Sequence, residues 1–454
     1  MKNYDVVVVG SGCGSLISDE AAGHGLKTAL IEKGPLIGGT CLNWGCIPSK
    51  MLIYTADRIV EIEEARKLGV TTEIISIDFS SVMSRMRQSR KGSQSHIREG
   101  IRQTANLDFY EGEARFVGDY TIEINGENIK GEKIFIASGS RPLIPPIKGL
   151  DSTAYLTNET ALELKEKPDS LIIIGGGYIA VEYGHFYAAM GTRVIILEMA
   201  DRLILSEEPE ISELLKKALS KRMEVHTSSQ AEEVKANDSG VTVVTKDKDS
   251  GKQRQFTAQQ LMMAVGRKSN ADRLQVENTG IELDNRGFIK TNNRLETSKQ
   301  NIWAVGDVNG QQMFTHMANL EAAIAAQNAF HGTEYEIDYS TVPHAVYSHP
   351  QIASVGLKEE DARKDHNILV GRTAYFDIAK GETMMEKDGF AKAIVEKDSK
   401  IIVGFHIIGP YAPVLIQEVV NAMSTGGNIA EINQGVHIHP ALSELIPATL
   451  RNLG

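Results

Sequence analysis

Residues 4–15 read YDVVVVGSGCGS, and this stretch decides the fold of the N-terminal part of the chain. The unbroken apolar run Val6 to Val9 predicts a parallel strand that is buried on both faces. Gly10 permits a tight turn after the strand, and Gly12 lets the backbone approach a pyrophosphate at the positive end of the following helix. Ser15 replaces the third glycine of the usual fingerprint, so the motif is incomplete.

The same unit occurs a second time along the chain. Residues 171–182 read LIIIGGGYIAVE and lead to a second strand that ends at Glu198, as the first unit ends at Glu32. Each carboxylate follows its glycine turn by about 20 residues, where an acid can bind a ribose hydroxyl. Two copies predict a chain that binds two dinucleotides. Glu198 would repel a 2′-phosphate and favours NADH, while Ala180 and the nearby Arg202 keep NADPH open.

Residues 38–50 read GGTCLNWGCIPSK and contain a close cysteine pair, Cys41 and Cys46. In a regular helix their Cα atoms would lie roughly 8–9 Å apart, beyond the ~7 Å limit for a disulfide. A pair that forms a disulfide therefore requires a distorted helix, which Gly45 and Pro48 would favour. A thiol at a helix start has a lowered pKa and exchanges readily.

Zinc binding is a weaker interpretation of the cysteine pair. A site made by the pair with His437 and His439 is disfavoured because the residues between the cysteines offer few ligands. The third cysteine of the chain, Cys13, is interpreted as a small residue packed in the glycine turn.

Composition limits the remaining possibilities. The chain has 454 residues, enough for about three domains, and a formal charge of -11 without dense Lys/Arg runs. A nucleic-acid partner is therefore not expected. The first apolar run is too short for a membrane span, and no signal peptide is evident, so we expect no membrane association and a cytoplasmic location.

The segment 38–50 resembles the signature of the class I pyridine nucleotide-disulfide oxidoreductases. The resemblance covers the whole chain and includes ASGSRP at 137–142, VGRKSN at 265–270, IWAVGD at 302–307 and HIHPALSE at 437–444. The second of these segments departs from the family by having Ser269 in place of proline.

The resemblance implies an α/β fold with two Rossmann-like domains, one for FAD and one for NAD(P), and a C-terminal α+β dimerisation domain. The FAD-binding domain is expected to be split, comprising 1–147 and 267–335. The NAD(P)-binding domain is expected at 148–266 and the dimer-interface domain at 336–454. A homodimer with a shared active site follows from this resemblance.

The resemblance also implies the roles of the reactive residues. Cys41 would be the thiol that exchanges with substrate, and Cys46 the thiolate next to the flavin. His439, supplied by the partner subunit and supported by Glu444, would be the base. Lys50 and Glu182 would form an ion pair beside the flavin, and Tyr178 would be the aromatic gate over it.

The resemblance also implies which residues of this chain contact the cofactors. Those expected for FAD are Gly10, Gly12, Gly14, Ser15, Glu32, Lys33, Gly39, Thr40, Lys50, Ala114, Ser138, Gly139, Arg141, Gly306, Asp307, Met313, His316 and Ala318. Those expected for NAD(P) are Gly175, Gly177, Tyr178, Ile179, Glu182, Glu198 and Gly266.

Three functions remain open at this point. Leu42, Ile47 and Ser49, with Glu198, favour a dihydrolipoamide dehydrogenase, which would act with lipoyl-carrying proteins. Ser15 and Ser269, with the stretches 17–20, 51–54 and 438–442, are more typical of mycothione reductase and favour an NAD(P)H-dependent reductase of another low-molecular-weight disulfide, of the mycothione or glutathione reductase kind. A flavin redox sensor or metal-binding protein without turnover is the alternative from a different class.

Overall fold

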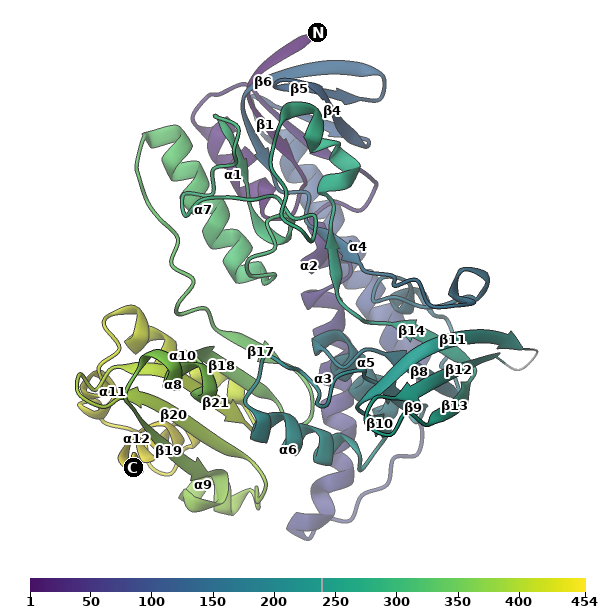
Figure 1. Cartoon of the computed structure of the whole chain (residues 1–454), viewed down its shortest axis with the longest axis vertical. Helices are drawn as coiled ribbons and strands as arrows, with labels where there is room; N and C mark the ends of the chain where they lie inside the picture. The colour runs from purple at the N-terminus through teal and green to yellow at the C-terminus, as the bar shows by residue number, and fades with distance from the viewer. Residues whose placement is uncertain (238–239) are drawn as a thin grey trace. The chain divides into compact units, whose positions relative to one another are not determined.

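The computed structural model describes residues 1–237 and 240–454 (Figure 1). The chain divides into two compact units. Unit 1 comprises 1–49, 84–143 and 266–339, and unit 2 comprises 50–83, 144–265 and 340–454. Residues 148–266 and 336–454 fall largely together in unit 2, so the division into three domains stays a prediction.

Unit 1 is built on a parallel sheet. Its strands run in the order β3-β2-β1-β6, and β16 pairs with β6 in parallel as well. Val6, Val7 and Val8 are fully buried, as the apolar run predicts. The strands are β1 (Lys2–Val9), β2 (Thr28–Glu32), β3 (Leu107–Glu111), β6 (Glu127–Ile136) and β16 (Ile302–Ala304), with the antiparallel hairpin β4 (Ala114–Gly118) and β5 (Thr121–Ile124).

Helices and a short ladder complete unit 1. Helices α1 (Gly14–Gly23) and α7 (Thr315–His331) pack against each other, and α2 (Gly39–Asn43) is short. The two segments at which the chain leaves and re-enters this unit pair antiparallel as β7 (Ser140–Pro142) and β15 (Arg267–Ser269). The long helices α3 (Cys46–Glu64) and α4 (Phe79–Gln103) contribute residues to both units.

Unit 2 repeats the topology of the first sheet. Strands β8 (Ser170–Ile174), β9 (Arg193–Leu197), β10 (Glu224–His226) and β14 (Gln260–Met263) are parallel in the order β10-β9-β8-β14. This order matches β3-β2-β1-β6 of unit 1, as expected from the repeated sequence unit. Helix α5 (Tyr178–Ala189) follows β8, α6 (Pro209–Leu219) follows β9, and a separate antiparallel sheet contains β11 (Ser229–Asn237), β12 (Gly240–Asp247) and β13 (Gln253–Ala258).

The C-terminal part of unit 2 is an antiparallel sheet in the order β17-β18-β21-β20-β19. Helices α10 and α12 pack on it through a core that includes Phe405, Val419 and Leu445. The strands are β17 (His344–Val346), β18 (Ile352–Gly356), β19 (Ile368–Ala374), β20 (Phe390–Glu396) and β21 (Ile402–Ile408). The helices are α8 (Glu359–Asp365), α9 (Ala379–Thr383), α10 (Ala412–Ser424), α11 (Ile429–Asn433) and α12 (Leu445–Arg451).

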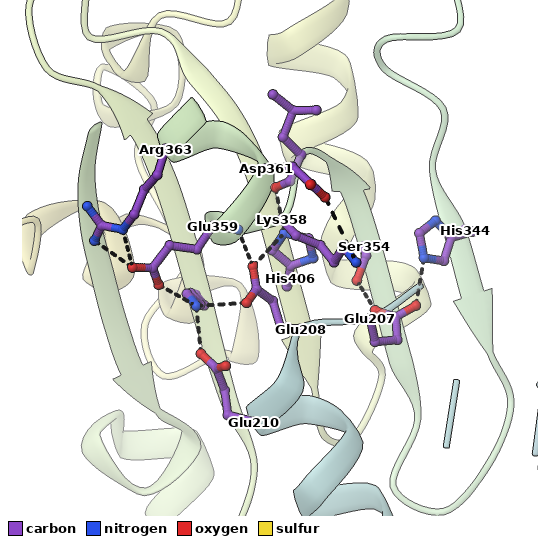
Figure 2. Close-up of polar contacts among 12 residues, drawn as sticks. Glu207, Glu208, Glu210, His344, Ser354, Lys358, Glu359, Asp361, Arg363 and His406 are labelled. Carbon is purple, nitrogen blue, oxygen red and sulfur yellow. Dashed lines mark hydrogen bonds and ion pairs between the residues drawn. The ribbon is translucent and has the colours of Figure 1, made fainter. Parts of the chain in front are cut away.

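A buried network of charged side chains joins the start of α6 to this sheet within unit 2 (Figure 2). Lys392, 4% exposed, contacts Glu208 at 2.9 Å and both Glu210 and Glu359 at 2.7 Å. Burial opposes the charge of Lys392, but these three carboxylates raise its pKa overall. The network thus replaces water as the partner of a buried ammonium group.

A second part of the network centres on Glu207, whose side chain is completely buried (Figure 2). Its carboxylate contacts His344 and the Ser354 hydroxyl, both at 2.6 Å. Although burial raises the pKa of Glu207, these hydrogen bonds lower it overall. The segment between β9 and α6 is therefore tied to β17 and β18.

In the part of the chain that the structure describes, no helix combines the length and apolarity that a membrane crossing requires.

Candidate active site

The dithiol segment is helical on both sides of a break. Helix α2 ends at Asn43, Trp44 takes a non-helical conformation, and α3 begins at Cys46. The helix is therefore interrupted between the two cysteines, which is the distortion that a disulfide between them would require. The Ser49 hydroxyl donates to the Gly45 carbonyl at 2.7 Å and closes the first turn of α3.

Both cysteines are in the reduced thiol form. The Cys46 thiol lies 3.3 Å from the Thr315 hydroxyl, at the start of α7. The Cys46 thiol hydrogen bonds to Cys41 and, together with burial, raises the pKa of Cys41. This is opposite to the lowering expected for a thiol at a helix start. The reason is local, because a neighbouring thiol and desolvation outweigh the dipole of a helix of five residues. The pKa shift therefore favours the neutral thiol form of Cys41.

Asn43 anchors the segment and was not singled out from the sequence. Its buried side-chain amide donates to the carbonyls of Leu36, Ile37 and Gly39 at 2.9–3.1 Å. The side chain of Gln94, on α4, donates to its amide oxygen. A fully buried asparagine satisfied in this way fixes the loop before Cys41. The position of Asn43 between the two cysteines is the one sequence feature that could have drawn attention to it. Its hydrogen-bond partners are set by the fold and are not visible in the sequence.

The first glycine turn fits a dinucleotide. Gly10 has φ 110°, and a Cβ there would lie 2.2 Å from the Ala137 carbonyl oxygen. A Cβ on Gly39 would lie 2.5 Å from Gly12 Cα, so the dithiol segment touches the turn backbone to backbone. A pyrophosphate would bind at the N-terminal end of α1, where the first peptide N–H groups of a helix have no partner within the helix. The cradle has the form that an FAD pyrophosphate requires.

Glu32 is held at this turn. Its carboxylate accepts hydrogen bonds from the Ser11 backbone at 3.1 Å and from the Ser11 hydroxyl at 2.6 Å. The Lys33 backbone N–H donates to the other oxygen at 2.9 Å. The acid is thus oriented beside the glycine turn, as an acceptor for ribose hydroxyls must be.

The Asp307 segment closes the same end of the sheet. Asp307 accepts from the Ser140 hydroxyl at 2.5 Å, and its carboxylate lies 3.5 Å from Arg267 Nε. The backbone N–H of Gly306 donates to the fully buried Glu321 at 2.6 Å. The sequence did not indicate Glu321 because its partners come from separate segments. Ser138 Oγ is buried without a hydrogen-bond partner among the described residues, as a group reserved for a ligand would be.

The other residues expected at FAD all lie in unit 1, except Lys50. Arg141 is bound by the chain itself, because its guanidinium pairs with Asp272 at 2.6 Å and donates to the Ser269 carbonyl. This places Arg141 in the β7–β15 ladder. Ala318 is buried and packs toward Gly306. The remaining positions lie at the start of α1 (Gly14, Ser15), on α2 (Thr40), at the start of β4 (Ala114), just before β7 (Gly139) and around the start of α7 (Met313, His316).

The second glycine turn, in unit 2, has the same form. Gly175 has φ 117°, and a Cβ there would lie 2.2 Å from the Ala264 carbonyl oxygen. A Cβ on Gly177 would meet nothing within 4 Å, so this face is open to a dinucleotide. The carboxylate of Glu198 faces Gly176 and accepts from the Ala200 N–H at 2.7 Å. The acid therefore stands at the turn, where a ribose would bind.

Tyr178 begins α5 directly after this turn, followed by Ile179. Its hydroxyl lies 2.7 Å from the Ser206 hydroxyl, and its ring lies 6.2 Å from that of His344. Burial, and then the charge of Glu207, raise the pKa of Tyr178 to about 12. The tyrosine therefore stays neutral and is linked through Ser206 and His344 to the Glu207 network.

Lys50 and Glu182 form the expected ion pair. Lys50 Nζ lies 2.8 and 3.0 Å from the two carboxylate oxygens of Glu182. Tyr347 adds two contacts, a backbone N–H to Glu182 at 3.1 Å and an aromatic ring 4.6 Å from the ammonium group. Gly266, by contrast, belongs to unit 1, whereas the other expected NAD(P) residues belong to unit 2.

His439 and Glu444 are brought together in the C-terminal part of unit 2. His439 Nδ1 lies 2.9 Å from the Glu444 carboxylate, which also accepts from the Ala441 N–H at 3.1 Å. His439 and the Ala441 N–H lower the pKa of Glu444. The imidazole side chain is 69% exposed, so its second nitrogen is open to a substrate or a second chain. His437 makes a separate pair with Glu418 at 2.7 Å.

Two dinucleotide turns, a dithiol and an oriented imidazole define an FAD-dependent disulfide oxidoreductase that uses NAD(P)H. The chain belongs to the pyridine nucleotide-disulphide oxidoreductase family, whose model matches residues 4–328. The dimerisation domain of that family matches residues 342–449.

Relatives with established names cover nearly the whole chain. A dihydrolipoyl dehydrogenase of Bacillus subtilis is 35% identical, over 97% of this chain and 94% of the relative. A mycothione reductase of Mycobacterium tuberculosis is 34% identical over the full length of both chains. The solved structure of the HOCl-induced flavoprotein disulfide reductase RclA of Escherichia coli is 28% identical, with a TM-score of 0.88 and 99% of each chain covered.

Proposed function

We propose that the protein is a homodimeric dihydrolipoamide dehydrogenase, which converts dihydrolipoamide and NAD⁺ to lipoamide and NADH. The observation that carries the choice of NAD is Glu198, whose carboxylate stands at the second glycine turn. A carboxylate there accepts a ribose 2′-hydroxyl and repels a 2′-phosphate. The choice of substrate is supported by the relatives named dihydrolipoyl dehydrogenase, which match nearly the whole chain.

The chain's own residues account for the thiol chemistry. His439 of the partner subunit takes the proton of one substrate thiol, and Glu444 stabilises the imidazolium that forms. The substrate thiolate attacks Cys41 Sγ in the oxidised enzyme, the Cys41–Cys46 bond breaks, and Cys46 leaves as a thiolate. The second substrate thiol then displaces Cys41, and lipoamide departs with its S–S bond formed. The electron pair now resides on the enzyme dithiol.

When bound, FAD would be held by the Gly10–Gly12 turn, Glu32 and the Asp307 segment, and it would supply the two-electron chemistry between the enzyme dithiol and NAD⁺. Lys50, fixed by Glu182 and Tyr347, is the cation expected beside the flavin. Tyr178 would serve as the aromatic gate over the flavin.

The decisive experiment is steady-state turnover of purified holoenzyme. NADH and NADPH are each supplied with lipoamide, mycothione and glutathione disulfide, and dihydrolipoamide is tested with NAD⁺ for the forward reaction. We expect turnover with NADH and lipoamide, and a strong preference for NADH. Activity with NADPH and mycothione, without lipoamide turnover, would overturn the proposal in favour of a mycothione reductase, the function of the relative that matches over its full length.

Replacement of Glu198 separates coenzyme choice from substrate choice. Glu198→Ala should lower the preference for NADH over NADPH by at least about tenfold, because the 2′-phosphate is no longer repelled. The ratio of the two kcat/KM values measures this. An unchanged ratio would mean that Glu198 does not select the coenzyme.

Cys41→Ser tests the proposal against a redox sensor without turnover. We expect the variant to retain FAD and to lose disulfide turnover. Two-electron reduction of the parent enzyme should also produce a long-wavelength band from a thiolate next to the flavin. A parent that shows neither turnover nor this band would support a sensor or a metal-binding flavoprotein.

A further inference from the structure

Two histidines and a glutamate gather in unit 1 at positions that the redox chemistry does not use. We name Glu20, His24 and His331 the His–Glu cluster. Their ligand atoms all lie within 4.8 Å of one another. The cluster belongs to the C-terminal ends of α1 and α7, whereas the glycine turn and Thr315 lie at the opposite, N-terminal ends of these helices.

The sequence builds the cluster by ending two helices in the same way. His24 and His331 stand at the ends of α1 and α7, and each is followed by a glycine in the left-handed conformation. Gly25 has φ 79° and Gly332 has φ 65°. Glu20 precedes His24 by four residues, one turn earlier on the same helix face. Since α1 and α7 pack together, the three side chains meet.

Contacts within the chain already orient the nitrogen and oxygen atoms that would bind a metal. His331 Nε2 lies 3.4 Å from Glu20 Oε1, and the two imidazole rings stack edge to face with centroids 4.9 Å apart. Gln327, one turn earlier on α7, donates from its side-chain amide to Glu20 Oε1 at 3.2 Å. A hydrogen bond from outside the ligand set is the usual way in which proteins orient a ligating carboxylate.

The electrostatic setting favours a cation. The C-terminal ends of two helices converge here, and each carries partial negative charge on its last carbonyl groups. Two imidazoles and one carboxylate are donors suited to late first-row divalent ions such as Zn²⁺, Ni²⁺ and Cu²⁺. The side chains of Glu20 and His331 are 28% and 39% exposed, so water can complete the coordination.

The geometry requires only small adjustments. Zn–N and Zn–O bonds of about 2.1 Å in a tetrahedral site place ligand atoms about 3.4 Å apart. The present separations reach 4.8 Å at most. Rotation of exposed side chains about their χ angles closes this difference without movement of either helix.

We propose that Glu20, His24 and His331 form a binding site for a divalent late transition-metal ion, with water in the remaining positions. The site is separate from the dithiol and from the proposed dehydrogenase reaction. The alternative is that the histidines only offset the helix dipoles and that His331 shares a proton with Glu20. That alternative predicts no specific metal binding.

The test is equilibrium binding of Zn²⁺ to oxidised holoenzyme by calorimetry. Oxidation matters because the Cys41–Cys46 dithiol would itself bind zinc, whereas its disulfide does not. We expect one ion per chain in the micromolar range. His24→Ala and His331→Ala should each weaken binding at least about tenfold, and Glu20→Gln should weaken it as well. Lowering the pH to about 5.5 should also weaken binding, because Zn²⁺ requires neutral imidazoles.

His96→Ala is the matched control, because His96 is an exposed histidine on α4 outside the cluster. Retention of FAD in every variant shows that the chain is folded. Cu²⁺ supplies an independent readout, since the electron paramagnetic resonance spectrum should show coupling to two imidazole nitrogens that is reduced in both histidine variants. Zn²⁺ binding that is absent from the parent, or that is equal in the parent and all cluster variants, would overturn the proposal.

Discussion

At the scale of single residues, the C-terminal motif contains two histidines only two positions apart, and each pairs with a carboxylate. His439 pairs with Glu444 and His437 with Glu418, at 2.9 and 2.7 Å. Their exposure differs, because the His439 side chain is 69% exposed and that of His437 is 15% exposed. Only the first presents an open imidazole edge, so the two histidines should differ in function although they look alike in sequence.

This difference gives a paired prediction. His439→Gln should lower kcat for dithiol oxidation by about 100-fold or more, because the general base is lost. His437→Gln should change kcat far less. Turnover of both variants, normalised to bound FAD, is the measurement. Equal losses in the two variants would contradict the assignment of the base to His439.

Burial of two other histidines predicts how stability depends on pH. Burial lowers the pKa of His185 and of His406 below the ordinary 6.5. A folded-state pKa below the unfolded one means that the stabilisation is complete above pH 6.5 and is lost as pH falls through that value. Each histidine should therefore contribute a slope of at most about 1.4 kcal/mol per pH unit below pH 6.5.

Urea unfolding of the holoenzyme between about pH 5 and pH 7.5 measures this slope. His406→Gln should flatten the slope by the contribution of one histidine, whatever it does to stability at neutral pH. His96→Gln, at an exposed position, should leave the slope as in the parent. An unaltered slope in the His406 variant would show that this histidine does not titrate with unfolding.

At the scale of elements, the charged network of Figure 2 attaches the start of α6 to β20 and α8 within unit 2. Lys392→Met should lower the free energy of unfolding by about 3–5 kcal/mol, because Glu208 is left buried without a counter-charge. Lys364→Met is the matched control. Lys364 pairs with Asp361 on the surface, with a side chain 62% exposed, so its loss should lower the free energy of unfolding far less than the loss of Lys392. Urea midpoints of the two variants and the parent give the comparison.

Several helices and strands could be predicted from the sequence. The two glycine turns and their parallel strands were predictable because local pattern sets them, from the run Val6 to Val9 to the acid at Glu198. The break between α2 and α3 was expected on the condition that Cys41 and Cys46 form a disulfide, because a regular helix would hold them too far apart.

The contacts that complete the site could not be predicted in this way. Cys46 meets Thr315 across 269 positions, and Lys392 meets Glu208 across 184. Such pairs depend on how distant segments pack, and the sequence pattern of one segment does not indicate which residue of another segment it will contact. The raised pKa of Cys41 was missed for the same reason, since it depends on which groups surround the thiol.

At the scale of the whole molecule, the segment around His439 presents apolar side chains to the outside of the single chain. Val436 and Ile438 are fully and 77% exposed, and they flank His437 immediately before the proposed base. An apolar exposed stretch next to a catalytic group is typical of a surface that a partner covers. The match of residues 342–449 to a dimerisation domain supports a second copy of this chain as that partner.

A shared site predicts recovery of activity in mixed dimers. Homodimers of Cys41→Ser and of His439→Gln should each be inactive, or nearly so. After dissociation and reassociation of equal amounts, half of the dimers are hybrids, and each hybrid has one site with both Cys41 and His439 intact. Activity should therefore rise to about one quarter of that of the parent. If both residues of a site came from the same chain, no activity would return.

The contact between Gly12 and Gly39 has a consequence for how such an enzyme can diversify. The cradle for the pyrophosphate and the dithiol segment meet through backbone atoms, with no room for a Cβ on Gly39. Their separation is therefore set without any side chain that mutation could lengthen or shorten. Coenzyme preference at Glu198 and the substrate surface around His439 lie on other segments. New specificities can thus arise by substitution at those segments while the spacing between the pyrophosphate cradle and the dithiol segment stays the same.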